Sequence, residues 1–157
     1  MSNVIARGDQ SDLTSIPQTI MIDKGKHDGL YPGLAVVSSE GIIVGKIVEV
    51  KDEISEVFLS NNSECKLAAT LLNESKTSGI TEGDLGLTIK MNFIPQDIDI
   101  KIGDIVVTSG LEQPIPRGLV IGSVLGVDKE NNELWQTATI EPLLDAGALT
   151  IVSVILP

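Results

Sequence analysis

Two β-branched runs joined by a loop rich in proline and glycine constrain the fold of this chain more than any other feature. The runs cover Ile105–Thr108 and residues 119–124, and the loop at residues 110–118 contains two prolines and two glycines. Proline fixes φ and lacks a backbone donor, while glycine reaches conformations that other residues avoid. The pattern predicts two β-strands connected by a stiff loop, which we call the proline loop.

Strand-like alternation recurs along the rest of the chain. Residues 65–71 place apolar side chains at every second position, and residues 84–91 do the same with Leu85, Leu87, Ile89 and Met91. Residues 149–155 are apolar on both faces, which predicts a strand covered from two sides. Since no long window keeps a helical period, we expect a chain that is almost entirely β.

A weak internal repeat relates residues 20–50 to residues 89–127. Each copy runs through a strand, a charged turn, a Val-Val strand and a strand interrupted by glycine, namely Gly45 in the first copy and Gly122 and Gly126 in the second. Glycines inside apolar strands allow a small sheet to bend and close. The repeat predicts two small antiparallel barrels packed together, and a single larger β-sandwich is the alternative.

The seam between the barrels is expected near residues 73–83. We therefore assign residues 1–75 to the first barrel and residues 76–157 to the second. A strand could be exchanged between them, because the pattern does not show whether the last strand closes the first barrel.

The charge and composition exclude several classes of partner. The net charge is −11, from 22 acidic and 11 basic residues, which disfavours binding to nucleic acid or anionic lipid. With 42% apolar residues the chain can bury a core, and its single cysteine cannot form an internal disulfide. No apolar run reaches the roughly 20 residues of a membrane-spanning helix.

Residues capable of catalysis do not form a recognisable pattern. The single histidine, His27, lies in a charged turn, and Ser109 lacks the glycine frame of a nucleophile elbow. Cys65 begins an alternating strand and is expected to be a small buried side chain. No zinc or calcium spacing occurs, and no glycine loop precedes a helix. We predict no catalytic residue, no cofactor and no metal.

With catalysis and metal binding disfavoured, the remaining function is the binding of a partner through the protein surface. Ile115, between Pro114 and Pro116 in the proline loop, is the best candidate for an exposed apolar contact, because a stiff loop loses little entropy on docking. The alternative is that Ile115 folds back and plugs a barrel end. Pro116 and Tyr31 are further candidate contacts. Phe93 and Trp135 are not counted among these candidate surface contacts.

Phe93 and Trp135 are expected in the barrel cores, because large aromatic side chains dominate small cores.

Residues at fixed spacing across the second repeat resemble the extracytoplasmic β-domain of the rod shape-determining protein family MreC. They are Phe93, Pro95, Asp97, Ile98, Gly103, Asp104, Val107, Thr108, Ser109, Gly110, Pro116, Gly118 and Gly122. The resemblance extends along nearly the whole chain. It departs at the proline loop, where Gln113 and Ile115 stand in place of the glycine and phenylalanine that are frequent in the family.

The resemblance implies two six-stranded barrels on the extracytoplasmic, periplasmic face. It also implies a non-catalytic scaffold of the cell-elongation machinery that self-associates and binds a class B penicillin-binding transpeptidase, alongside MreD and the MreB-linked complex. The family's membrane helix and coiled coil precede this domain and have no counterpart here, so we expect an excised domain whose anchor to the inner membrane lies in the absent segment. Homo-oligomers are implied for the full-length protein.

Two other functions are weighed against this scaffold. A barrel-type binding module of an envelope transport adaptor shares the Lys-x-Gly-Asp-x-Val strand entry, but it predicts a flanking helical hairpin or lipoyl-like repeat. A degenerate hydrolase is the third class, and labelling of Ser109 or Cys65 by an activity probe would support it.

Overall fold

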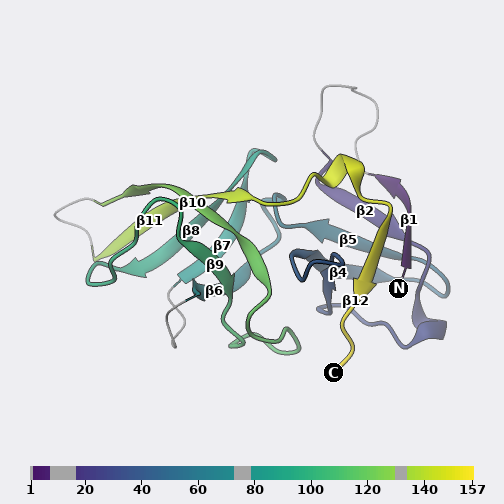
Figure 1. Cartoon of the computed structure of the whole chain (residues 1–157). Helices are drawn as coiled ribbons and strands as arrows, with labels where there is room; N and C mark the ends of the chain where they lie inside the picture. Colours follow the sequence, from purple (N-terminus) through teal and green to yellow (C-terminus); the bar gives the residue numbers. More distant parts are fainter. Residues whose placement is uncertain (1, 8–16, 73–78, 130–133) are drawn as a thin grey trace.

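The computed structural model describes residues 2–7, 17–72, 79–129 and 134–157. These residues form two bodies side by side, with strands in both, and among them helix occurs only in two short turns, η1 (Lys26–Asp28) and η2 (Ala146–Ala148) (Figure 1). Among the described residues, no helix combines the length and apolar character that crossing a membrane requires.

Each body is a closed barrel of six antiparallel strands, which confirms the predicted fold. In spatial order the first barrel contains β1 (Ser2–Arg7), β12 (Ile151–Val154), β3 (Ala35–Val37), β4 (Ile43–Val50), β5 (Ser55–Leu59) and β2 (Thr19–Ile22). The second contains β10 (Val120–Asp128), β11 (Trp135–Pro142), β8 (Thr88–Pro95), β7 (Gly79–Asp84), β6 (Leu67–Leu71) and β9 (Ile105–Thr108). Closure pairs β1 with β2 and β9 with β10, so neither sheet ends in an unpaired edge strand.

The division predicted at residue 75 does not separate the strands of the two barrels. Strand β6 precedes that residue but pairs with β7 and β9 of the second barrel. Strand β12 returns from the far end of the chain and pairs with β1 and β3 of the first barrel. Because closure needs a sixth strand on each side, the chain crosses between the barrels after β5 and again after β11.

The alternation predicted for residues 65–71 is confirmed. Cys65, Leu67, Ala69 and Leu71 are all buried in the core of the second barrel. Two other strand predictions are confirmed only in part: a strand forms in each segment, and Ile89 and Met91 are buried as expected. Leu85 and Leu87 are exposed, because they lie in the turn before β8 begins. In β12, Ile151 faces solvent while its neighbour Val152 is buried, so that strand is covered from one side only.

Glycines interrupt the strands where backbones approach closely. A Cβ added at Gly45 in β4 would lie 1.9 Å from the carbonyl oxygen of Phe58, and one at Gly122 in β10 would lie 2.2 Å from that of Glu141. Real side chains do not tolerate such distances, so these two positions need glycine. Nothing lies within 4 Å of a Cβ added at Gly126. Close approach of the backbones therefore requires glycine at Gly45 and Gly122 but not at Gly126, which borders a register shift between β10 and β11.

Candidate partner-binding surfaces

The proline loop joins β9 to β10 and packs inward against the first barrel. Ile115 is only 2% exposed and belongs to one buried cluster with Ala35 and Ile43, which come from β3 and β4. The prediction that Ile115 forms an exposed contact is therefore wrong. The stiffness of the loop serves a contact within the chain, since an apolar side chain held at a fixed position fills the junction between the barrels.

Hydrogen bonds from Thr108 hold both ends of the proline loop. The Thr108 hydroxyl donates to the carbonyl oxygen of Pro116 (2.7 Å) and accepts from the backbone N–H of Leu119 (3.0 Å). The backbone N–H of Gly118 donates to the carbonyl oxygen of Thr108 (2.9 Å). Thr108 is itself buried, so these bonds are shielded from water and fix the path of the loop.

Polar contacts also cross between the barrels at this loop. The Lys46 ammonium of β4 lies 2.6 Å from a carboxylate oxygen of Glu112, and only 16% of the lysine side chain is exposed. A second polar contact joins the barrels, because the backbone N–H of Val120 donates to the carbonyl oxygen of Gly41 (3.2 Å). Apolar packing, an ion pair and a backbone bond thus join the two barrels along one side.

Pro116 and Tyr31 are exposed, so both are available to a partner. They lie near the same junction. A Cβ added at Gly33, two residues after Tyr31, would lie 3.7 Å from the Pro114 ring. The turn that carries Tyr31 therefore approaches the proline loop.

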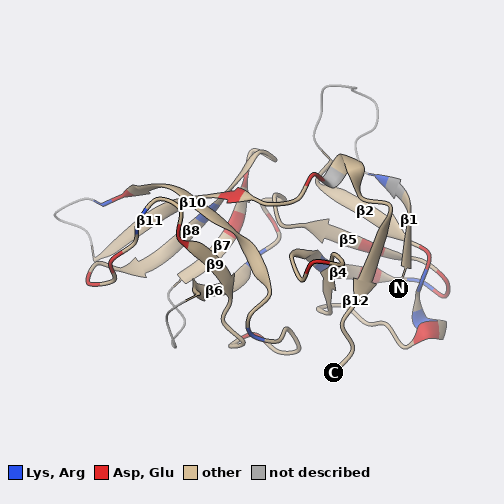
Figure 2. Cartoon of the chain, in the orientation of Figure 1, with Lys and Arg blue, Asp and Glu red and all other residues tan. Residues whose placement is uncertain are grey.

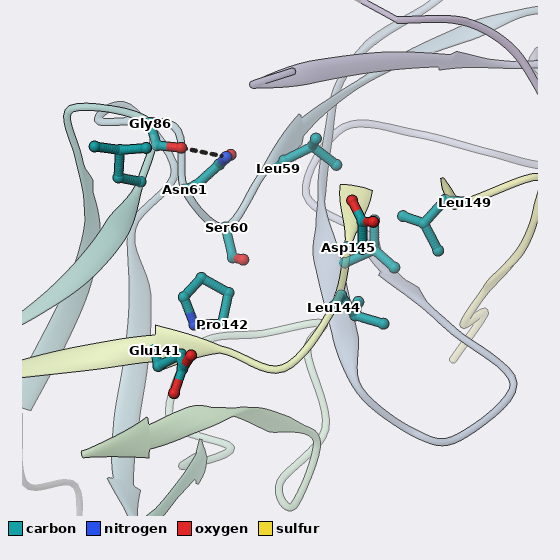
Figure 3. Close-up of a pocket in the computed structure, with 11 residues that line it drawn as sticks. Leu59, Ser60, Asn61, Gly86, Glu141, Pro142, Leu144, Asp145 and Leu149 are labelled. Atoms are coloured by element: carbon teal, nitrogen blue, oxygen red, sulfur yellow. Dashed lines mark hydrogen bonds between the residues drawn. The ribbon is translucent and has the colours of Figure 1, made fainter. Parts of the chain in front are cut away.

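A cleft of about 250 Å³ lies elsewhere between the barrels (Figure 3). Leu59 faces it from β5, and Leu144 and Leu149 face it from the segment that leads to β12. The carboxylates of Glu141 and Asp145 also line it. The described residues around this cleft include no histidine or cysteine, and the cleft offers mainly aliphatic surface, two carboxylates and the Ser60 hydroxyl.

An aromatic pair stands on the outer wall of the second barrel. Phe93 is 58% exposed and Trp135 is 47% exposed, so the prediction that both are core residues is wrong. Their rings meet edge to face, with centroids 6.3 Å apart and an interplanar angle of 84°. We call Phe93 and Trp135 the aromatic patch.

A β-bulge explains why Phe93 faces outward. Ile89 and Met91 are buried, so strict alternation would turn residue 93 inward as well. Between β8 and β11 the register shifts by one residue at this point, and Phe93 takes φ 60°. Ile94 then fills the inward position. A sequence pattern does not show a bulge that depends on the partner strand, so sequence reasoning missed this surface.

Because Phe93 holds a left-handed backbone conformation, glycine should suit this position better than alanine. We expect Phe93→Gly to exceed Phe93→Ala in free energy of unfolding by about 1 kcal/mol, since only alanine keeps the clash of a Cβ at positive φ. Urea unfolding of the two variants measures the difference. Lys90, an ordinary exposed position of the same strand, is the control, and there glycine should be the less stable. Equal stability of the Phe93 variants would show that the bulge is unstrained.

The residues considered for catalysis are placed apart. His27 is exposed in η1 on the first barrel, whereas Ser109 follows β9 in the second. The Ser109 hydroxyl accepts from the backbone N–H of Leu111 (3.3 Å), as expected for a strand-ending serine. Cys65 is buried at the barrel junction. No cluster of three or more histidine, cysteine, aspartate or glutamate side chains suited to a metal occurs in the part of the chain that the structure describes.

Burial raises the pKa of the Cys65 thiol from 9.0 to about 12. Between these values the unfolded chain loses the thiol proton while the folded chain keeps it, so the free energy of unfolding should fall as the pH rises. The decline should approach about 1.4 kcal/mol per pH unit. Urea unfolding from about pH 8 to about pH 11 measures it, with Cys65→Ala as the control for other titrating groups. Identical slopes for the two proteins would contradict the shifted pKa.

Comparisons with known proteins agree with the two-barrel fold. The family model described as rod shape-determining protein MreC, barrel core, matches residues 9–156. The cell shape-determining protein MreC of Listeria monocytogenes is 33% identical over 141 residues. That match covers 87% of the chain and 47% of the relative, so the chain spans about half of the relative's length.

Solved structures share the two-barrel architecture. The crystal structure of MreC from Pseudomonas aeruginosa has a TM-score of 0.81 at 25% identity, covering 99% of this chain and 97% of that one. A complex between penicillin-binding protein PBP2 and MreC from Helicobacter pylori includes a chain with a TM-score of 0.74. The two chains are 18% identical, and the match covers 92% of this chain and 87% of that one. This structural likeness shows a shared fold. By its family match and its relatives, the chain belongs to the MreC family of rod shape-determining proteins.

Proposed function

We propose that this chain is a non-catalytic scaffold domain of the bacterial cell-elongation machinery, which binds a class B penicillin-binding transpeptidase. The observation that carries the proposal is the family match over residues 9–156. The Helicobacter pylori complex, which joins an MreC with PBP2, indicates the class of partner. The proposed role is to hold a peptidoglycan synthase in place and so to maintain cell shape.

The described structure supports a scaffold because its contacts make the pair of barrels stiff. Both sheets are closed, so their backbone groups pair within the chain. Ile115 and the ion pair between Lys46 and Glu112 fasten one barrel to the other. A rigid body of this kind keeps its outer side chains in fixed positions, which lowers the entropic cost of binding.

The wider assembly is part of the same proposal and follows from the family. We propose that the domain works on the extracytoplasmic face, anchored to the inner membrane through an N-terminal segment. There it would self-associate in the full-length protein and act alongside MreD and the MreB-linked elongation complex. Tyr31 and Pro116, both exposed near the proline loop, are proposed as peripheral partner contacts.

Calorimetric titration of the chain with the extracytoplasmic portion of the class B penicillin-binding protein from the same genome tests this function. We expect saturable binding with a Kd on the order of 1 to 100 µM. An unrelated acidic β-barrel protein, titrated in the same way, controls for non-specific attraction to negative charge. Absence of binding up to several hundred µM would overturn the assignment.

A further inference from the structure

The aromatic patch is an unusual location for aromatic residues, because it lies on the surface of a small barrel. The chain has only four, and two of them, Phe93 and Trp135, form this exposed pair. Large aromatic side chains stabilise a small barrel most when they fill its core. In the second barrel the core is aliphatic, and the aromatic rings stand outside it. The placement forgoes burial and leaves two rigid apolar rings available to another molecule.

Backbone strain supports the same conclusion independently. Phe93 holds φ 60°, a region that is unfavourable for a bulky side chain. The bulge that imposes this value turns Phe93 to solvent and buries Ile94 in its place. Strain of this kind often marks a functional position, because a folded protein retains it only where its surroundings enforce it.

Three exposed aspartates lie near the aromatic patch in the sequence or in the strand register. Asp97 and Asp99 lie exposed in the turn after β8, and Asp128 lies exposed at the end of β10. Asp128 pairs in register with Thr137, two residues from Trp135. The Gln96 side chain donates to the carbonyl oxygen of Trp135 (3.0 Å), which ties the acidic turn to the start of β11. We call these three aspartates the acidic rim.

The turn after β8 and the end of β10, where acidic and basic segments lie close together, are at the end of the second barrel that points away from the first (Figure 2). Three lysines of the region are engaged within the chain. The ammonium groups of Lys90 and Lys101 each lie 3.8 Å from a carboxylate, of Asp84 and Asp99 respectively. Lys129 donates to the carbonyl oxygen of Gln96 (3.0 Å). Lys101 offsets the charge of Asp99, and Lys129 keeps its own charge next to Asp128, so the three aspartates of the acidic rim and these two lysines together carry a net charge of −1 beside the aromatic patch.

We propose that the aromatic patch and the acidic rim form the principal docking surface for the transpeptidase, and that they receive an apolar protein surface bearing arginine or lysine side chains. This inference rests on the proposed function and adds the site and the chemistry of recognition. A guanidinium group can stack on the indole or phenyl face while it pairs with a neighbouring aspartate. Aromatic anchors ringed by polar groups are typical of the centre of a protein interface.

Charge argues against a second copy of this chain as the occupant. Each copy carries a net charge of −11. A two-fold interface over the aromatic patch would bring the Asp97, Asp99 and Asp128 side chains of both copies together. Like charges brought into one interface cost affinity and select against that partner. A basic protein surface has the complementary charge.

Titration of the same transpeptidase portion with single variants tests the aromatic part. Phe93→Ser and Trp135→Ser should each weaken binding about tenfold or more, as removal of an interface anchor does. Ile151→Ser removes a similarly exposed apolar side chain from the first barrel and should change Kd less than about twofold. Because all three side chains are largely exposed, far-UV circular dichroism and thermal unfolding should show intact folds.

A matched pair of charge reversals tests the acidic rim. Asp97→Lys with Asp128→Lys changes the net charge as much as Asp52→Lys with Glu53→Lys, in an exposed turn of the first barrel. The rim variant should bind about tenfold more weakly at physiological salt, while the distant variant changes Kd less than about twofold because screening acts over about 8 Å.

The outcomes separate this inference from the proposed function. If the unmodified chain binds and the Phe93 and Trp135 variants bind equally well, the docking surface is overturned and the scaffold function stands. If only the charge reversal has no effect, the basic character of the partner surface is overturned. If the aromatic variants abolish self-association and leave transpeptidase binding unchanged, the occupant is a second copy. If the unmodified chain does not bind, both proposals fail.

Discussion

Gly45→Ala should lower the free energy of unfolding by about 3 kcal/mol, the upper part of the usual range for overpacking. The added Cβ would lie 1.9 Å from the carbonyl oxygen of Phe58, and its two next neighbours, at 2.8 and 2.9 Å, are backbone atoms as well. A flexible side chain could move aside, but here β4 and β5 themselves would have to separate. The registered pairing of Gly45 with Leu59 would be disturbed, and with it the closure of the first barrel.

Thermal unfolding measures this effect, and we expect Tm to fall by roughly 10 °C. Gly126→Ala is the matched control, because it is also a strand glycine but has open space where the Cβ would go. It should be neutral or slightly stabilising. Equal losses at the two positions would show that glycine serves strand flexibility in general and that close approach of the backbones is not the cause.

Ile115→Ala should cost about 3 kcal/mol, within the range for truncating a buried isoleucine. The side chain fills the junction between the barrels and contacts a cluster that includes residues of both. Truncation leaves a cavity that the loop cannot close, because Thr108 holds its two ends. Ile115→Asp should be more damaging still, since it buries a charge without a partner.

Chemical unfolding of Ile115→Ala measures the loss, with Pro116→Ser as the control from the same loop. Pro116 is exposed, so its substitution should cost less than about 1 kcal/mol. The Ile115→Ala variant should also bind the transpeptidase with unchanged affinity at a temperature where it remains folded. Loss of binding without loss of stability would mean that Ile115 is a partner contact after all.

Local patterns in the sequence were enough to predict the fold class and several strands. The alternation at Cys65, Leu67, Ala69 and Leu71 depends only on the period of two, and the structure buries all four. The same pattern failed at Leu85 and Leu87, because a turn can carry apolar residues at the same spacing. Strand order failed for a different reason. Which barrel β6 and β12 join depends on pairing between distant segments, and local periodicity carries no information about it.

The candidate surfaces were harder to predict, because each depends on contacts that are distant in the sequence. Ile115 between two prolines has the pattern of an exposed loop tip, yet it is buried in a cluster made mainly of second-barrel residues together with Ala35 and Ile43 of the first barrel. Phe93 and Trp135 are residue types that usually fill a small core, yet a bulge between β8 and β11 turns Phe93 outward beside Trp135. The proline loop was identified correctly and the strand before Phe93 in part, but the sides that Ile115 and Phe93 face were not, and no strand was predicted around Trp135.

Hydrogen–deuterium exchange of the chain, alone and bound to the transpeptidase portion, tests the central claim most directly. That claim is that the proline loop fastens the barrels internally while the outer end of the second barrel receives the partner. Binding should slow exchange most in residues 93–99 and 134–137, and should change residues 110–118 little, because only the peripheral contact at Pro116 is expected there. Slower exchange confined to residues 110–118 or to the first barrel, with no change around Phe93 and Trp135, would contradict it.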